Sequence, residues 1–514
     1  MFTKKNINIF CLLATIVIMV SFLITLYKNI NHFPIPNGDV FQYIYDGRQY
    51  INFKLPSSIH PPPFVPFLIC LVAKIFKHVE YPELFSAYTI NFIAATLILL
   101  NVFLLLYKKT PFLALSTVFL LATNKIYFLT SINLTNEIVY GFFLTLTLLL
   151  YQKKHYNIAY LLSGFLFLIR YESIVFQISI FTIEFFYNKK QFKIKNFIIA
   201  FVPVIIWLVI LNFHSVGNSI FQNVYFSEIY YGIKNIPNLN VFKSLADIIM
   251  FNPFASFSYR LFGENKYNIF FSNKIDIIIS IIIFFLLILT LFRKKNTNIN
   301  RIVYLTLFFQ LIFIAAFPQF CIRYLASVIW IIYLLIIDRS NKKIKTLIII
   351  SLLIFNISQI NNKSIYDAPD GFEYRYTADW LNKQNLSQPT RVLIYDPIII
   401  GYYIHNNKIV LDINSYEYYN VPNTYNKCQD NMTCVVKELN KQDSNISQIY
   451  IITTSYSSQP IENFADQETT KMHHMSAFRN FPTSEEKQHY QLLDTVGDQE
   501  YWAKIYKYIP PKTP

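Results

Sequence analysis

Long apolar segments, separated by short polar connections, recur through the first 360 residues of this 514-residue chain. A helix needs roughly 20 apolar residues to cross about 30 Å of hydrocarbon, and a helix satisfies its own backbone groups in lipid. About eleven segments meet or approach that length: 9–27, 85–107, 111–129, 136–151, 157–170, 172–187, 196–213, 274–292, 302–319, 321–338 and 344–360. The sequence therefore predicts a polytopic α-helical membrane domain over 1–360, followed by a polar region over 361–514.

Lys and Arg residues in the connections predict the orientation of these spans. The formal net charge is +15, and the basic residues gather in alternate short connections, which indicates membrane topology and argues against nucleic-acid binding. These connections contain Lys4 and Lys5, Lys108 and Lys109, Lys153 and Lys154, 189–195, 293–301 and 339–345. We expect the N-terminus to be cytoplasmic and 361–514 to be exported. No small-residue cleavage site follows the first span, so we expect it to be a retained anchor.

Two long connections lie on the expected outer side, at 28–84 and 214–273. In the first, four residues share one face of a helix: Asp39, Tyr43, Asp46 and Tyr50. The prolines at 61–63 stop a helix, and the apolar run that follows them is too short to span a membrane. We therefore predict two short helices in the membrane interface. The second connection is long enough to indicate a functional loop or a disordered segment.

The region 361–514 has a soluble composition in which elements alternate. The pattern predicts a helix at 378–384 and strands at 391–395, 408–411, 449–453 and 500–508. Strands interleaved with helices are typical of a small α/β domain. Cys428 and Cys434 are close in sequence, and an oxidising compartment would join them as a disulfide. A metal site is the competing interpretation, but no His lies near enough to supply further ligands.

Asp39 is the candidate for chemistry in the first long connection. A carboxylate within hydrogen-bond reach of an acceptor hydroxyl or amine acts as a general base. Asp39 also suits the N-cap of the helix that follows, or a solvated loop position. We expect Asp46 either to position Asp39 or to be a surface charge. His60 is expected either to bind a phosphate or substrate, or to hold its loop in place.

Four charged residues are expected at the outer ends of predicted spans: Glu137, Arg170, Glu172 and Arg323. Ionisable residues at membrane depth are costly and usually functional. Arginine suits phosphate because its planar guanidinium presents a fork of donors, so two arginines beside carboxylates indicate a phosphate clamp near a general base. The structural alternative is that these arginine side chains extend to the membrane interface.

Several segments, taken in order, resemble the motifs of one superfamily. They are Gly-Asp-Val-Phe-Gln-Tyr at 38–43, His-Pro-Pro-Pro-Phe-Val-Pro-Phe-Leu at 60–68, Thr-Asn-Glu at 135–137, 163–172, Arg-Tyr-Leu at 323–325, and 376–381, 401–403 and 410–412 in the polar region. The chain resembles the glycosyltransferase C (GT-C) superfamily. Within it, the chain is most similar to bacterial polyprenyl-phosphate-sugar transferases related to protein mannosyltransferases and to the aminoarabinose transferase of lipid A. It departs from the pattern at Val40, where Glu is frequent, and at Tyr171, where Pro is usual.

This resemblance implies an enzyme of the bacterial inner membrane. The enzyme would transfer a sugar, with inversion, from an undecaprenyl-phosphate-linked donor to a lipid, glycan or protein acceptor on the outer face. Asp39 would be the general base, and the residues lining the donor site would be Glu137, Arg170, Glu172 and Arg323. Further substrate-binding residues are expected to be Tyr43, Asp46, His60 and Tyr324. The connection 214–273 would be a lid that orders when the lipid enters. No cofactor is expected besides the donor lipid, with a divalent metal left as an alternative.

Two other classes of protein fit part of this pattern. A non-catalytic protein that handles or transports lipid-linked glycans would use Arg170 and Arg323 but would have no need of Asp39. An O-antigen polymerase or ligase also uses lipid-linked donors. Such proteins tend to have their large external loop late in the chain, whereas the acidic connection comes first here.

Reporter fusions test the predicted orientation. We expect tags at Lys109, Lys190 and Lys295 to report the cytoplasm, because positively charged connections stay on that side. Tags within 225–245 and after 361 should report the outside. A reporter fused after 361 that behaves as cytoplasmic would show that the number of spans is wrong, and that this region is not exported.

Overall fold

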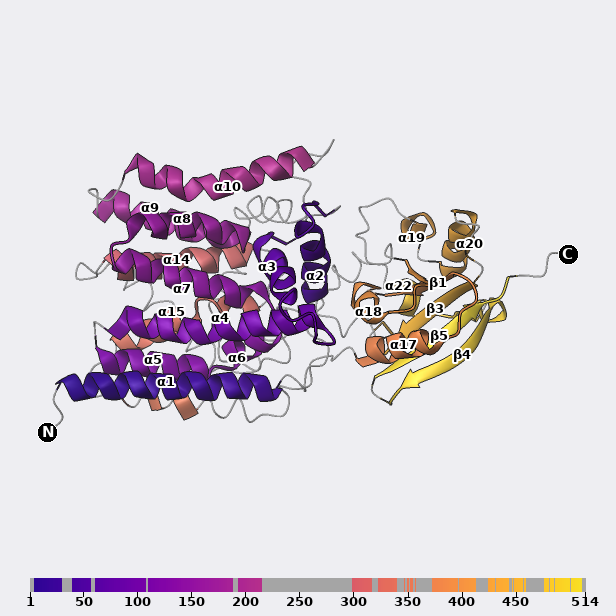
Figure 1. Ribbon diagram of the computed structural model, residues 1–514, viewed down its shortest axis with the longest axis horizontal. Helices are drawn as coiled ribbons and strands as arrows, with labels where there is room; N and C mark the ends of the chain where they lie inside the picture. Colours follow the sequence, from indigo (N-terminus) through magenta and orange to yellow (C-terminus); the bar gives the residue numbers. More distant parts are fainter. Residues whose placement is uncertain are drawn as a thin grey trace. The chain divides into compact units, whose positions relative to one another are not determined.

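The chain divides near residue 366 into two compact units. The structure, a computed structural model, describes residues 4–29, 39–56, 61–107, 110–187, 193–214, 298–316, 322–339, short pieces of 346–356, and 372–412, 424–458 and 476–510 apart from isolated positions. The first unit is helical, and the second combines strands and helices (Figure 1). The division lies close to the predicted boundary at 360.

Roughly parallel helices make up most of the first unit (Figure 1). They are α1 (Lys4–Asn29), α4 (Pro82–Tyr107), α5 (Pro111–Ala122), α6 (Lys125–Ile132), α7 (Asn136–Gln152), α8 (Tyr156–Phe165), α9 (Ile174–Tyr187), α10 (Ile194–His214), α14 (Asn298–Ala316) and α15 (Ile329–Arg339). Helix α4 packs against α1, α5 and α7, whereas α10 packs mainly against α8. Consequently α4 is central, and α1 and α10 lie towards opposite edges (Figure 1).

Apolar helices identify the first unit as part of a membrane protein. Among the described residues, three helices are long and apolar enough to cross a membrane, at Asn6–Asn29, Pro82–Tyr107 and Ile194–Phe213, and a fourth span results if the bent pair α5 and α6 counts as one. Large apolar side chains on α1 and α10 point outwards, including Phe10 at 65% and Phe213 at 79% exposure. This outward-facing surface suits lipid. The total of eleven spans stays a prediction, and 274–292 lies outside the described residues.

Interruptions shorten several helices in which the sequence predicts continuous spans. The α5–α6 pair bends by 58°, and the side chain of Asn124 caps α6 by accepting from the backbone N–H of Tyr127. After α8, the chain forms two 3₁₀ turns, η2 (Leu166–Leu168) and η3 (Tyr171–Ser173). A further one, η5 (Ile322–Leu325), precedes α15. The predicted spans 157–170, 172–187 and 321–338 therefore each include a 3₁₀ turn at one end, and the break at Arg170 lies at the predicted boundary between the first two. Polar residues gather at these breaks.

Two short helices follow α1, as predicted for the first long connection: α2 (Asp39–Tyr50) and α3 (Phe64–Ala73). They pack together at one end of the helical unit (Figure 1). Their contact depends on Gly47, because a Cβ atom there would lie 2.2 Å from the Pro66 carbonyl oxygen and 2.7 Å from Cys70 Sγ. The Cys70 thiol in turn donates to the Ile44 carbonyl at 3.4 Å. The close approach of α3 thus sets the orientation of α2.

The second unit contains a five-stranded sheet with the order β2-β1-β3-β5-β4. The strands are β1 (Thr390–Ile394), β2 (Ile409–Leu411), β3 (Gln448–Thr454), β4 (Tyr490–Gly497) and β5 (Trp502–Tyr508). Strand β1 pairs in parallel with β2 and β3, whereas β5 is antiparallel to β3 and β4. The predicted helix and strands at 378–384, 391–395, 408–411, 449–453 and 500–508 correspond to α17 (Phe372–Lys383), β1, β2, β3 and β5.

Helices cover both faces of this sheet. Leu393, Ile449 and Ile451 form one core with α19 (Thr424–Lys427), α20 (Met432–Gln442) and α22 (Ser476–Arg479). Tyr450 alternates with Ile449 and Ile451, and its ring contacts Trp380 of α17. Helix α17 also packs against α18 (Pro397–Tyr403). Because side chains alternate along a strand, α17 and α18 lie on the face opposite α20.

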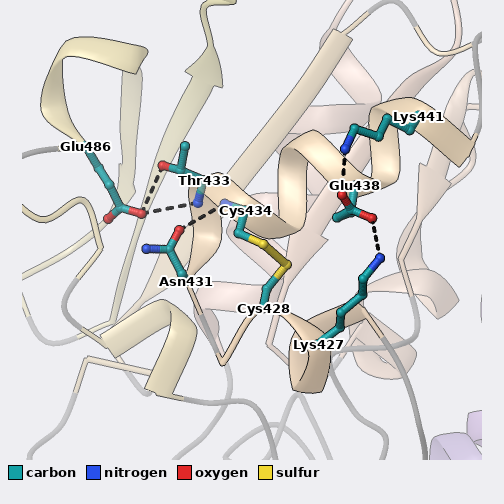
Figure 2. The surroundings of a disulfide bond; sticks show 8 residues. All are labelled: Lys427, Cys428, Asn431, Thr433, Cys434, Glu438, Lys441 and Glu486. Carbon is teal, nitrogen blue, oxygen red and sulfur yellow. Dashed lines mark hydrogen bonds and ion pairs between the residues drawn. A yellow bond between two sulfur atoms is a disulfide. The ribbon is translucent and has the colours of Figure 1, made fainter.

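Cys428 and Cys434 form a disulfide between the end of α19 and the start of α20 (Figure 2). The Asn431 side chain accepts from the backbone N–H of Cys434 at 2.9 Å, and the Glu486 carboxylate accepts from the N–H and hydroxyl of Thr433. On the other side of α20, Glu438 forms ion pairs with Lys427 and Lys441. The start of α20 is therefore held covalently and by hydrogen bonds, and its charged face is exposed.

The contact between α2 and α3 can be tested at Gly47. We expect Gly47→Ala to destabilise the protein by about 1–3 kcal/mol, because the added methyl group meets backbone atoms of α3 that cannot move aside locally. The measurement is the thermal unfolding midpoint of the protein in detergent. Gly401→Ala is the control, since its Cβ would meet only the end of the Leu411 side chain, at 3.0 Å. Equal midpoints for the two variants would contradict this description of the contact.

Candidate active site

Helix α2 turns one face towards the interior of the helical unit. Asp39 lies half-buried in its first turn, where a carboxylate interacts favourably with the helix dipole. Tyr43 is 7% exposed and Asp46 is 0% exposed. The face predicted to carry these residues is therefore the buried face of the helix, and Asp46 is a core residue instead of a surface charge.

Asp46 is a carboxyl group in an almost apolar setting. Gln42 Nε2 donates to Asp46 Oδ1 at 2.8 Å, and Asp46 Oδ2 has no hydrogen-bond partner among the described residues. Burial raises the pKa of Asp46 to about 8, although the hydrogen bond from Gln42 opposes this rise. At neutral pH the group is therefore largely protonated, so it can donate a hydrogen bond as well as accept one.

A second part of the site is a buried ion cluster with Arg170 at its centre. Its guanidinium lies 2.6 Å from Glu137 and contacts Glu172. It also donates to Asn136 Oδ1 at 2.5 Å, and it lies 4.7 Å from the centroid of the Tyr324 ring. The two carboxylates and Arg170 are each at most 5% exposed. With one cation and two anions, the trio has a formal charge of −1 if all three groups are ionised.

Local backbone structure brings these residues together. Glu137 lies in the first turn of α7. Arg170 is extended, with φ −151° and ψ 131°, at the interruption between η2 and η3, and Glu172 follows within η3. Asn136 links the two places, because its side-chain nitrogen donates to the Ile169 carbonyl at 3.3 Å. The structure thus assembles Glu137, Arg170, Glu172 and Tyr324, all of which the sequence analysis selected.

Aromatic residues connect this ion cluster to α2. Tyr171, which follows Arg170, accepts a hydrogen bond from Trp207 Nε1 of α10 at 3.2 Å. The Trp207 ring packs edge-on against Tyr50 of α2, with centroids 6.4 Å apart. Burial raises the pKa of Tyr50, and the nearby Asp46 and Tyr171 raise it further. The interior face of α2 and the Arg170 cluster therefore adjoin one another.

The sequence analysis did not place Tyr50, Asn136 or Trp207 in a site. Tyr50 occurs in the helical pattern with Asp39 and Asp46 and could have been selected on that basis. Asn136 directly precedes Glu137 in a quoted motif. No local signal identifies Trp207, because its contacts come from segments more than 30 positions away.

Some of the expected site residues fall partly or wholly outside the described residues. His60 and the connection 214–273 lie outside the described residues. Arg323 belongs to η5, next to Tyr324, but only its backbone is described. In the described part of the chain, no group of three or more His, Cys, Asp or Glu residues is arranged to hold a metal ion.

Solved structures share the fold of this chain. ArnT from Cupriavidus metallidurans, bound to undecaprenyl phosphate, matches with a TM-score of 0.57 and 9% identity over 95% of this chain and 97% of that chain. The oligosaccharyltransferase of Archaeoglobus fulgidus in its apo form matches with a TM-score of 0.57 and 13% identity over 96% and 80%. The same enzyme tethered to an acceptor peptide also has a TM-score of 0.57, at 13% identity over 95% and 74%.

At these identities the likeness concerns the fold. No protein family and no curated protein matches the chain by sequence. The chain therefore shares its fold with ArnT, which was solved with undecaprenyl phosphate bound, and with an archaeal oligosaccharyltransferase. The resemblance deduced from the motifs is therefore confirmed at the level of the fold.

The buried Asp46 carboxyl predicts a pH-dependent stability. Its folded pKa of about 8 exceeds its ordinary value of about 3.9, so the folded state binds more protons between these values. Stability should therefore fall as pH rises through this window, by at most about 1.4 kcal/mol per pH unit for this group. We expect Asp46→Asn to unfold with a weaker dependence on pH than the wild type, because asparagine stays neutral.

The measurement is chemical unfolding in detergent between about pH 5 and about pH 9. Glu80→Gln, which replaces an exposed carboxylate, is the control and should keep the wild-type slope. An identical slope for wild type and Asp46→Asn would contradict burial of this carboxyl group.

Proposed function

We propose that this protein is a membrane glycosyltransferase. It transfers a sugar from a polyprenyl-phosphate-linked donor to a lipid, glycan or protein acceptor on the outer face of a bacterial inner membrane. The observation that carries the proposal is the placement, within a GT-C fold, of Asp39 on the same helix face as buried polar groups that adjoin the Arg170 cluster. In the same proposal, the second unit is exported and the N-terminus is cytoplasmic, as the basic connections predict.

Asp39 is the proposed general base. It would take the proton from an acceptor hydroxyl or amine while the acceptor attacks the anomeric carbon from the face opposite the phosphate. The bond between that carbon and the phosphate oxygen breaks, and its electron pair stays on the lipid phosphate, which leaves as an anion. Attack from the opposite face inverts the configuration. Asp39 suits this role better than Asp46 does, because Asp46 is fully buried and largely protonated.

Arg170 and Arg323 have different proposed roles. Arg170 is already engaged by two carboxylates, so we assign it the positioning of Glu137 and Glu172. Arg323, beside the Tyr324 ring that faces Arg170, is the proposed ligand of the departing phosphate.

The test of this mechanism separates turnover from donor binding. Asp39→Asn keeps the size of the side chain but removes the proton acceptor, so transfer should fall by roughly a hundredfold while donor binding changes little. Arg323→Ala should weaken both donor binding and transfer, because a charged donor to phosphate is lost. The assay uses purified protein in detergent with a polyprenyl-phosphate sugar, and it measures binding and transfer independently.

Asp379→Asn provides the matched control, since Asp379 is exposed on α17, and this variant should retain wild-type transfer. An Asp39→Asn protein that folds, binds the donor and transfers at the wild-type rate would refute the catalytic role. That result would favour a protein that handles lipid-linked glycans without transferring them.

A further inference from the structure

Two buried polar atoms on α2 point to a binding position beside the Arg170 cluster. Asp46 Oδ2 and the Tyr50 hydroxyl are inaccessible to solvent, and neither has a hydrogen-bond partner among the described residues. They belong to residues four positions apart on one helix, which places them on the same face. Buried polar groups in proteins are almost always hydrogen-bonded, so two exceptions side by side require an explanation.

The surroundings of these atoms are aromatic and apolar. Tyr50 packs against a cluster formed by Phe167, Tyr171, Val204, Trp207 and Leu211. Two neighbouring polar groups already have partners: the Gln42 amide donates to Asp46 Oδ1, and the Tyr171 hydroxyl accepts from Trp207. Aromatic walls with a small number of convergent polar groups are typical of sites for neutral organic ligands.

We propose that Asp46 and Tyr50 form a hydroxyl-binding recess of the donor site, in which the carboxyl and phenol groups exchange hydrogen bonds with a hydroxyl group of the transferred sugar. This inference rests on the proposed function. It adds Tyr50 to the site and gives Asp46 a role in sugar recognition, separate from the phosphate ligands and from the base.

A hydroxyl group fits this recess better than an ion does. The Tyr50 phenol and the protonated Asp46 carboxyl each offer one donor and one acceptor, and a sugar hydroxyl offers the complementary pair. An anion is less well suited to this position, because Arg170, the cation of the adjoining cluster, is already held by Glu137 and Glu172. Tyr171, which follows Arg170 directly, places the recess next to that cluster, where the sugar of a donor bound through its phosphate would lie.

The experiment compares two kinds of probe on the full-length protein in detergent. The first is undecaprenyl phosphate alone, and the second is undecaprenyl phosphate linked to glucose, mannose or galactose. We expect at least one of the sugar-linked lipids to bind to the protein more tightly than undecaprenyl phosphate alone does. We call the ratio of the two affinities the sugar gain. Tyr50→Phe should reduce the sugar gain roughly tenfold, since it removes one hydrogen bond, while the affinity for bare undecaprenyl phosphate stays the same. Tyr45→Phe, the same change on the exposed side of α2, should alter neither affinity.

Substitutions of Asp46 give a second, independent readout. Asp46→Asn keeps both a donor and an acceptor in the same shape and should retain most of the sugar gain, whereas Asp46→Leu should abolish it. Thermal unfolding verifies that each variant is folded, and if Asp46→Leu does not fold, Tyr50→Phe decides.

Three results would overturn the inference. In the first, Tyr50→Phe lowers the affinities for bare and sugar-linked lipid equally, as a purely structural role requires. In the second, Tyr50→Phe leaves the sugar gain unchanged. In the third, the wild type binds undecaprenyl phosphate but gains nothing from any linked sugar. In all three the proposed function still stands. A wild-type protein that binds neither kind of probe refutes the proposed function itself, and the recess with it.

Discussion

The buried charge of Arg170 is the constraint on which the helical unit depends. Removing a guanidinium from water costs several kcal/mol unless it is paired and hydrogen-bonded. Here the partners are Glu137, Glu172, Asn136 and the Tyr324 ring, which come from α7, η3 and η5. Because these segments are distant in sequence, the cluster forms only when the helices have their native arrangement. Loss of Arg170 would leave two buried carboxylates without their cation, and breaking a buried ion pair typically costs about 3–5 kcal/mol.

Polar side chains satisfy the backbone at the interruptions in the helices. Irregular backbone at membrane depth is tolerated only where protein groups satisfy it. Protein groups satisfy the irregular backbone around Arg170. The backbone N–H of Arg170 donates to the Leu166 carbonyl at 2.9 Å, and the Asn136 side-chain amide donates to the Ile169 carbonyl. Asn124 has a comparable role at the α5–α6 bend, where its amide also donates to the Tyr333 hydroxyl at 2.9 Å. The polar side chains at the interruptions therefore support the backbone and, at Arg170, also form the candidate site.

Much of the fold can be predicted from the sequence, because long apolar segments and alternating strands are local signals. Thus α1, α4 and α10 lie where the predicted spans do, and four strands of the sheet lie within about a residue or two of their predicted bounds. The extra strand β4 was missed because its pattern is largely polar and exposed. The break at Arg170 lies at the predicted boundary between the spans 157–170 and 172–187, but the 3₁₀ turns on either side of it do not follow from hydropathy.

Some residues of the candidate site could likewise be predicted from the sequence, and others could not. Glu137, Arg170 and Glu172 could be selected because charge at membrane depth is conspicuous in sequence. The burial of Asp46 could not, since it depends on how α2 meets α3 and on the approach of Tyr171 and Trp207. A carboxylate in a polar-looking segment resembles a surface charge until its neighbours from elsewhere in the chain are known. Tyr50 belongs to the same helical pattern as Asp39 and Asp46, but its contact with Trp207 also depends on a segment that is distant in sequence.

The disulfide between Cys428 and Cys434 makes the covalent state of the second unit depend on the redox conditions that it meets. It closes across the start of α20, and in the described part of the chain the other cysteines, Cys11 and Cys70, are buried in the helical unit. A thiol pair of this kind becomes covalently joined only in an oxidising compartment. Under the proposed topology, the covalent state of α20 would distinguish chains whose second unit has crossed the membrane from those in which it has not.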